Sequence, residues 1–207
     1  VAIGRKGGEA AQMVWAFAVS PTNPENLLIG TDTAGIWKSS DAGASWRISS
    51  QGLNVAGTVD IAYDPDDETV AYVAASPNNS SNPYTANTGI YRSTDGGESW
   101  TLVKAVSFNR VMTNKIIQFG DVNTNGVRTV YVGTHQGGLW KSEDRGTTWN
   151  SLGRASDTIV DLYVNGMTLI TASLESGVMV STDGGVNWTA KNGFSSGTTT
   201  VTSIAVN

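Results

Sequence analysis

The 207-residue sequence contains no cysteine, which excludes disulfide frameworks, zinc-thiolate sites and thiol catalysis. Charged residues are scarce at 15%, and the formal net charge is -5, so no basic stripe exists to neutralise the phosphates of a nucleic acid or of an anionic membrane. The longest apolar run, residues 13–19, is far shorter than the roughly 20 residues that a membrane-spanning helix needs. We therefore expect neither a nucleic-acid partner nor insertion into a membrane.

Glycine, in contrast, is abundant at 24 residues, and 39% of the residues are hydrophobic. The apolar residues come in short bursts separated by Gly, Asn, Asp, Ser and Pro, which is typical of many short strands joined by turns. No segment has convincing helical periodicity. The sequence predicts a globular all-β protein, and its start at Val1 without an apolar leader suggests a processed or trimmed product.

One octet of the form SxDxGxxW organises the whole chain. A repeat of about 40 to 50 residues is the signature of a repeat architecture. Each octet follows three short apolar runs and precedes a fourth, weaker one, and four strands per repeat is the arithmetic of a β-propeller blade. The four copies are SSDAGASW (39–46), STDGGESW (93–100), SEDRGTTW (142–149) and STDGGVNW (181–188).

These repeats predict part of a propeller built from four-stranded antiparallel blades. The segment 200–207 repeats the first-strand pattern and would begin a fifth blade, so the ring is expected to need its remaining blades, or another chain, to close. The four predicted blades cover about 14–50, 58–104, 114–153 and 158–191.

The octet resembles the Asp box, or bacterial neuraminidase repeat, of sialidases, xyloglucanases and many uncharacterised secreted propellers. The resemblance implies the propeller fold and an extracellular or cell-surface, microbial protein. Families with this box include enzymes and non-enzymes, so the box leaves the question of catalysis open. The arginine triad of the sialidases has no counterpart among the arginines of this sequence.

The box itself is predicted to be structural. Its glycine supplies the positive φ of a tight turn, its Ser and Asp accept hydrogen bonds from turn amides, and its tryptophan buries a large ring. The box joins strands three and four of a blade. Because consecutive strands run antiparallel, it lies on the face opposite the loops that join strands two and three.

The loops on that opposite face contain the candidate chemistry. The second strands end at Asp32, Ser76, His135 and Ser173. The opening of the chain resembles the start of the xyloglucanases, where an Arg-Thr-Asp-x-Gly-Gly signature includes a catalytic carboxylate, and this resemblance implies that Asp32 is the corresponding carboxylate. Gly30 and Ala34 depart from the signature. Inverting hydrolysis also needs a second carboxylate roughly 6.5–9.5 Å away, which that family takes from a second propeller.

Two longer segments offer aromatic and amide groups that suit a sugar. The loop 76–88 contains Tyr84, and the segment 106–114 contains Phe108, Asn109 and Arg110. Long loops on a rigid scaffold often mediate function, but simple tolerance of insertions explains them equally well. His135, the only histidine, is a further candidate contact, although a solvated loop position is the commoner role.

No cofactor or metal is expected. The run DVNTNG at 121–126 matches the start of a calcium loop, but position twelve would be Val132 instead of a bidentate glutamate, and an Asn-Gly turn is the favoured interpretation. The sequence thus predicts a propeller that recognises a polysaccharide or glycan, as part of a xyloglucanase-like glycoside hydrolase. The alternative is a non-catalytic structural or protein-interaction module.

Overall fold

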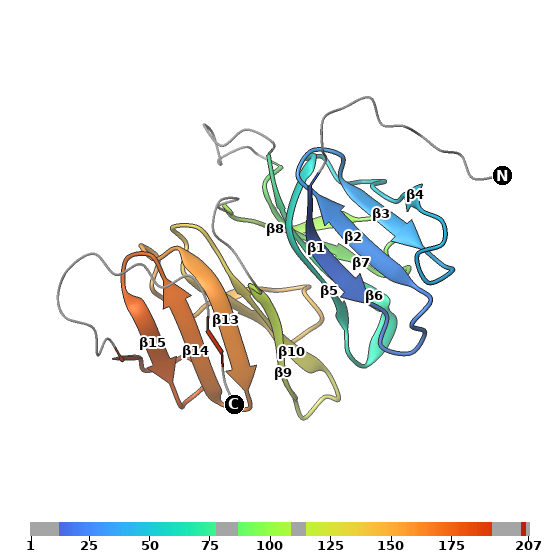
Figure 1. Cartoon of the computed structure of the whole chain (residues 1–207). Coiled ribbons are helices and arrows are strands. Elements are labelled where there is room, and N and C mark those ends of the chain that lie inside the picture. The colour runs from blue at the N-terminus through green and yellow to red at the C-terminus, as the bar shows by residue number, and fades with distance from the viewer. Residues whose placement is uncertain (1–12, 78–86, 109–114, 192–203, 206–207) are drawn as a thin grey trace.

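The computed structural model describes residues 13–77, 87–108, 115–191 and 204–205. These residues form four sheets, each of four antiparallel strands in sequence order. Figure 1 shows the sheets following one another from blue at the start of the chain to orange at its end. No helix long and apolar enough to cross a membrane occurs in the described part of the chain. The architecture is all-β and consistent with propeller blades, as the sequence predicted.

We call the sheets blades 1 to 4. Blade 1 contains β1 (Val14–Val19), β2 (Leu27–Thr31), β3 (Ile36–Ser39) and β4 (Arg47–Ile48); blade 2 contains β5 (Gly57–Asp64), β6 (Asp67–Ser76), β7 (Gly89–Ser93) and β8 (Thr101–Ala105). Blade 3 contains β9 (Ile117–Val122), β10 (Arg128–Gly133), β11 (Leu139–Ser142) and β12 (Asn150–Ser151); blade 4 contains β13 (Ile159–Asn165), β14 (Thr168–Ser173), β15 (Gly177–Ser181) and β16 (Thr189–Ala190).

The pairing register repeats from blade to blade, so equivalent positions can be identified. The first serine of each box pairs with a residue near the start of the second strand, and the first strand then pairs at a fixed offset. One set of equivalent inner-strand residues consists of Phe17, Ile61, Ile117 and Leu162, which pair with Ile29, Val73, Val132 and Thr171.

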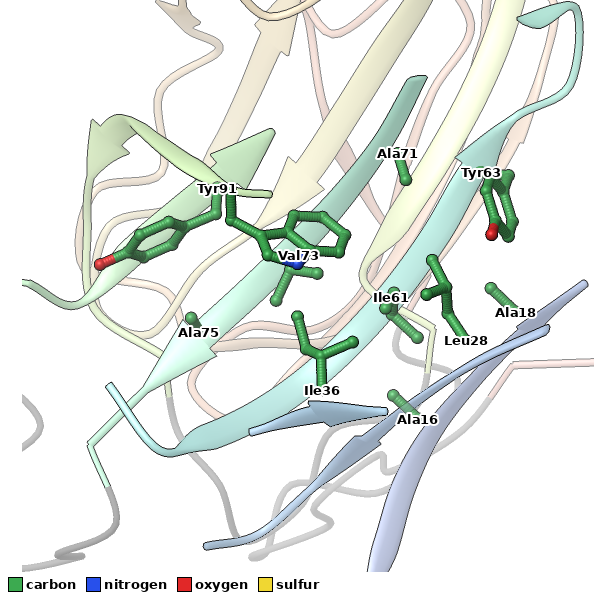
Figure 2. Close-up of a cluster of buried hydrophobic side chains, with 11 residues drawn as sticks. Ala16, Ala18, Leu28, Ile36, Ile61, Tyr63, Ala71, Val73, Ala75 and Tyr91 are labelled. Atoms are coloured by element: carbon green, nitrogen blue, oxygen red, sulfur yellow. The ribbon is translucent and has the colours of Figure 1, made fainter. Parts of the chain in front are cut away.

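The hydrophobic core lies between the blades. In the joint between blades 1 and 2, Ala16 and Ala18 of β1 meet Ile61 and Tyr63 of β5 in one buried cluster. Figure 2 shows these side chains converging from the two sheets. Two further clusters join blade 2 to blade 3 and blade 3 to blade 4. Because strand side chains alternate between two faces, each inner strand contacts one neighbouring blade with one face and the next blade with the other.

Buried carboxylates also join the blades. Asp60, only 2% exposed, accepts hydrogen bonds from the amides of Ile116 (3.0 Å) and Ile117 (2.9 Å) in blade 3 and an ion pair from Lys115 (3.0 Å). Asp161 occupies the equivalent position of blade 4, and its carboxylate accepts the amide of Ile204 at 2.8 Å. Ile204 therefore lies beside blade 4 in the way that Ile116 and Ile117 lie beside blade 2.

Candidate functional site

The four Asp boxes fold into one repeated turn. In the first box the hydroxyl of Ser39 donates to Asp41 (2.7 Å) and accepts the amide of Gly43 (2.8 Å), while Asp41 accepts the amide of Ser45 (2.8 Å). The same contacts recur in the other three boxes. Two successive residues have positive φ, 55° at Ala42 and 88° at Gly43, which explains the glycine.

The box carboxylates are occupied by these turn contacts. Burial acts to raise the pKa of Asp95, but hydrogen bonds from Ser99 and Ser93 outweigh burial and lower the pKa to about 2. The amide of Asn187 and the hydroxyl of Ser181 lower the pKa of Asp183 to about 2 as well. The aspartates are thus ionised acceptors for their own turns, which is a structural role.

Hydrogen bonds place the boxes on one side of the chain and the loops between second and third strands on the other. The amide of Ala42 donates to the carbonyl of Glu25 (3.1 Å) in the turn between β1 and β2. At the opposite end, the amide of Gly35 donates to the carbonyl of Ala56 (2.8 Å) in the segment between blades 1 and 2. We call this second side the loop face; its described residues include 31–36, 49–56, 134–138, 152–158 and 174–177.

Asp32 lies on the loop face, directly after β2. Its amide donates to the carbonyl of Met13 (3.1 Å), and its half-exposed carboxylate accepts one hydrogen bond within the described residues, from the hydroxyl of Thr33 (3.3 Å). Two residues earlier, a Cβ on Gly30 would lie 2.2 Å from the Thr58 side chain of blade 2. The glycine at this position of the signature therefore follows from close packing between the blades.

An open depression adjoins the Asp32 loop. It lies between the loop after β2 and the segment joining blades 1 and 2, so blade 1 and that segment both line it. The side chains that line it are mostly aliphatic or hydroxylic, a mixture that can contact the carbon-bound hydrogens of a sugar ring and bond its hydroxyls. The lining residues are Thr33, Ala34, Gly35, Ile48, Ser50, Leu53, Asn54, Val55 and Ala56.

His135 belongs to a second group on the loop face. Its Nδ1 lies 3.2 Å from the hydroxyl of Thr158, which donates to Glu175 (2.9 Å). Because the only proton of that hydroxyl goes to the carboxylate, Nδ1 of a neutral His135 ring must be the donor. Burial lowers the pKa of His135, with the charge of Glu175 opposing it. The ring is therefore mainly neutral at pH 7 and held in one tautomer.

The other loop-face carboxylates are more heavily bonded than Asp32. Burial acts to raise the pKa of Glu175, but bonds from the amide and hydroxyl of Thr158 outweigh it and lower the pKa. Asp157 forms an ion pair with Arg154 and accepts the hydroxyl of Ser176 at 2.7 Å. Asp32 thus has the most accessible carboxylate among these described groups.

The remaining predicted site residues differ in placement. Ser76 is buried and donates its hydroxyl to the carbonyl of Phe108 (3.2 Å), which fastens the segment after β8 to β6. Phe108 is 1% exposed and packs in the core between blades 2 and 3. A ring so enclosed offers no face to a sugar, and we remove Phe108 from the candidate contacts. Tyr84, Asn109 and Arg110 lie outside the described residues.

The run 121–126 forms a turn. The side chain of Asn123 accepts the amides of Asn125 (2.9 Å) and Val127 (3.1 Å), and its backbone accepts the amide of Gly126 (3.0 Å). Among the described residues, no three side chains of His, Cys, Asp or Glu lie together as ligands for a metal ion.

Thr158 and Glu175 were not anticipated from the sequence. They come from the segment before β13 and from the loop after β14, and they meet through a contact between positions 17 residues apart. Each follows or precedes ordinary strand residues with no motif around it. A local signal existed only for His135, as the single histidine at a strand end.

Known proteins with a related sequence and fold share this architecture. A model of the BNR/Asp-box repeat matches residues 91–102. A xyloglucanase of a Paenibacillus species is 30% identical over an alignment covering 81% of this chain and 20% of its own length. A probable oligoxyloglucan-reducing end-specific xyloglucanase of Neosartorya fischeri is also 30% identical, over 65% of this chain and 18% of its own.

The chain is a distant homologue of the GH74 xyloglucanases. The crystal structure of the GH74 xyloglucanase of Xanthomonas campestris superimposes with a TM-score of 0.66 over 89% of this chain at 17% identity, which shows the shared fold. The chain spans 31% of that structure and about a fifth of the length of the two curated relatives. It thus corresponds to part of a propeller in these homologues, consistent with an incomplete ring.

Proposed function

We propose that this chain is part of an extracellular or cell-surface Asp-box propeller that recognises carbohydrate within a xyloglucanase-like glycoside hydrolase. The homology supplies the substrate class, because the relatives are named for action on xyloglucan. The observation that carries the proposal is the position of Asp32, with a half-exposed carboxylate beside the depression on the loop face. The boxes, on the other side, take no part in binding.

Asp32 can act in two ways. As a carboxylate it accepts hydrogen bonds from sugar hydroxyls, and such charge-assisted bonds are stronger than neutral ones. In a hydrolase it would act as one of two carboxylates, and its partner would have to come from residues beyond the described loop-face groups, because Asp157 and Glu175 are bonded elsewhere. The depression beside it would receive the rest of the sugar.

The proposal is tested by measuring binding of xyloglucan oligosaccharides by isothermal calorimetry. Asp32→Ala is expected to weaken binding about tenfold or more, because the lost bond involves a charged group. The matched control is Glu25→Gln, an exposed carboxylate at the opposite end of blade 1, which should leave the affinity unchanged. Absence of binding by the wild type, or equal affinity of the Asp32→Ala variant, would refute the proposal.

A further inference from the structure

One face of blade 1 exposes a row of apolar side chains across its four strands. Phe17 pairs with Ile29, Ile29 with Trp37, and Trp37 with Ile48, so the four residues lie on the same side of the sheet. Val19 lies two residues along β1 and shares this side. We call these five residues the free face. It is the side of blade 1 turned away from blade 2, because Ala16 and Ala18 alternate with Phe17 and contact blade 2.

Equivalent residues in the other blades are covered. Phe17 is 48% exposed, whereas its equivalents Ile61, Ile117 and Leu162 are at most 2% exposed. Val19 is 44% exposed, whereas its equivalent Tyr63 is 6% exposed. Side chains of the same type at the same register thus differ only in whether a preceding blade covers them.

The outer part of the row shows the same difference. In blade 2, Tyr91 is the equivalent of Trp37 and is fully buried in the cluster shared with blade 1, whereas Trp37 is only half-buried. In blade 3 the equivalent is Trp140, and Lys104 from the outer strand of blade 2 lies over its ring at 3.9 Å. The preceding blade therefore covers this row out to its edge.

We propose that the free face is the docking surface for a further Asp-box blade of the same polypeptide, the last blade of a closed ring. The joint between blades 1 and 2 shows what such a blade presents. There the covering surface consists of Ala16 and Ala18 on the inner strand, with Leu28 and Ile36 behind them (Figure 2). Small side chains on the inner strand let the two sheets approach closely, and the aliphatic ones fill the space between them.

The contact of Ile204 with Asp161 identifies the source of this blade. It reproduces the contact of Ile116 and Ile117 with Asp60, so the strand position next to blade 4 belongs to this same chain. A second copy would have to place its own β1 at that position, which disfavours a ring of two copies. The homologues are three to five times longer than this chain, and that length can supply the remaining blades.

The test compares one substitution in two contexts. Phe17→Asp is made in the 207-residue chain and in the full polypeptide encoded by the same gene, and the melting temperature of each is measured. We expect a negligible shift in the 207-residue chain, where Phe17 is already half-exposed, and a fall of more than about 5 °C in the full polypeptide, where the charge would be buried. Phe17→Ala should lower the second value as well, and it serves if the charged variant does not fold.

Val186→Asp is the control, because Val186 is 76% exposed in the fourth box. It should be silent in both contexts. Equal small shifts of the Phe17 variants in the two contexts would overturn the proposal, as would a reading frame that ends at Asn207. A 207-residue chain that forms dimers in analytical ultracentrifugation, and loses them with Phe17→Asp, would replace the further blade with a second copy and overturn it too.

Discussion

At the scale of single residues, the aspartates of the boxes show how a recurring acid can be structural. Each accepts hydrogen bonds from a hydroxyl two residues before it and from an amide four residues after it. A carboxylate that accepts several local bonds is held ionised, and its pKa falls. The recurrence of the residue therefore reflects the recurrence of the turn.

This arrangement predicts how acid affects the protein. The pKa of Asp95 is about 2 in the folded chain, below its model value of 3.8, so its contribution to stability is complete above pH 3.8 and is lost as the pH falls through 2. Asp95→Asn should lower the free energy of unfolding at pH 7, and the difference from wild type should shrink towards pH 2. Urea unfolding at the two pH values measures it.

The control for this experiment is Glu25→Gln, which changes an exposed carboxylate outside the boxes and should show no such pH dependence. An Asp95→Asn deficit of the same size at both pH values would show that the charge of the carboxylate is irrelevant to the turn.

At the scale of elements, the box glycines meet two demands. Gly97 has a φ of 88°, and a Cβ there would also lie 2.8 Å from the side chain of Leu28 in blade 1. Gly126, in the turn between β9 and β10, has a φ of 73° but has nothing within 4 Å of a Cβ. The two glycines share the backbone demand and differ in the packing demand.

We expect Gly126→Ala to lower the free energy of unfolding by about 1 kcal/mol, which is the cost of a left-handed conformation. Gly97→Ala should cost roughly 1–3 kcal/mol more, because its methyl group collides with a packed core residue. Chemical denaturation of the two variants measures the difference. Equal losses would mean that Leu28 moves aside freely.

The strands and turns were predictable because their signals are local. The positive φ at the box glycines, the four strands per repeat and the Asn-Gly turn at 121–126 all follow from residues within a few positions of one another. The role of Phe108 was not predictable, because the segment after β8 has no periodicity to show which side chains turn inward. Its burial depends on blade 3, which begins only after residue 114.

At the scale of the whole molecule, stability depends on the joints between blades. Asp60 is the clearest case, since its carboxylate leaves blade 2 to accept two amides and an ion pair of blade 3. Burial raises the pKa of Asp60, and Lys115 opposes the rise. Sequence gave no warning of this contact, because its partners lie more than 50 positions away.

Asp60→Ala should lower the free energy of unfolding by about 3 kcal/mol, because it leaves buried amides and an ammonium group without their acceptor. Asp60→Asn retains one acceptor oxygen and should cost less. Urea unfolding of the two variants measures both losses. An Asp60→Ala variant as stable as the wild type would show that the joint is held by hydrophobic contacts alone.

The functional site was partly predictable at this scale as well. The end of the second strand identified Asp32 and His135, because the alternation of strands fixes which loops share a side. The fastening of His135 by Thr158 and Glu175, and the depression beside Asp32, arise from neighbouring blades and could not be seen in the repeat itself.

One box tryptophan departs from its three counterparts. The indole nitrogen of Trp100 donates to the carbonyl of Ser49 in the preceding segment at 2.8 Å, and the residue is 3% exposed, whereas Trp46, Trp149 and Trp188 donate to glycines of their own boxes. The environment of this indole therefore changes when blades 1 and 2 separate, even if every turn stays intact. Its fluorescence is a built-in optical probe of cooperativity between neighbouring repeats.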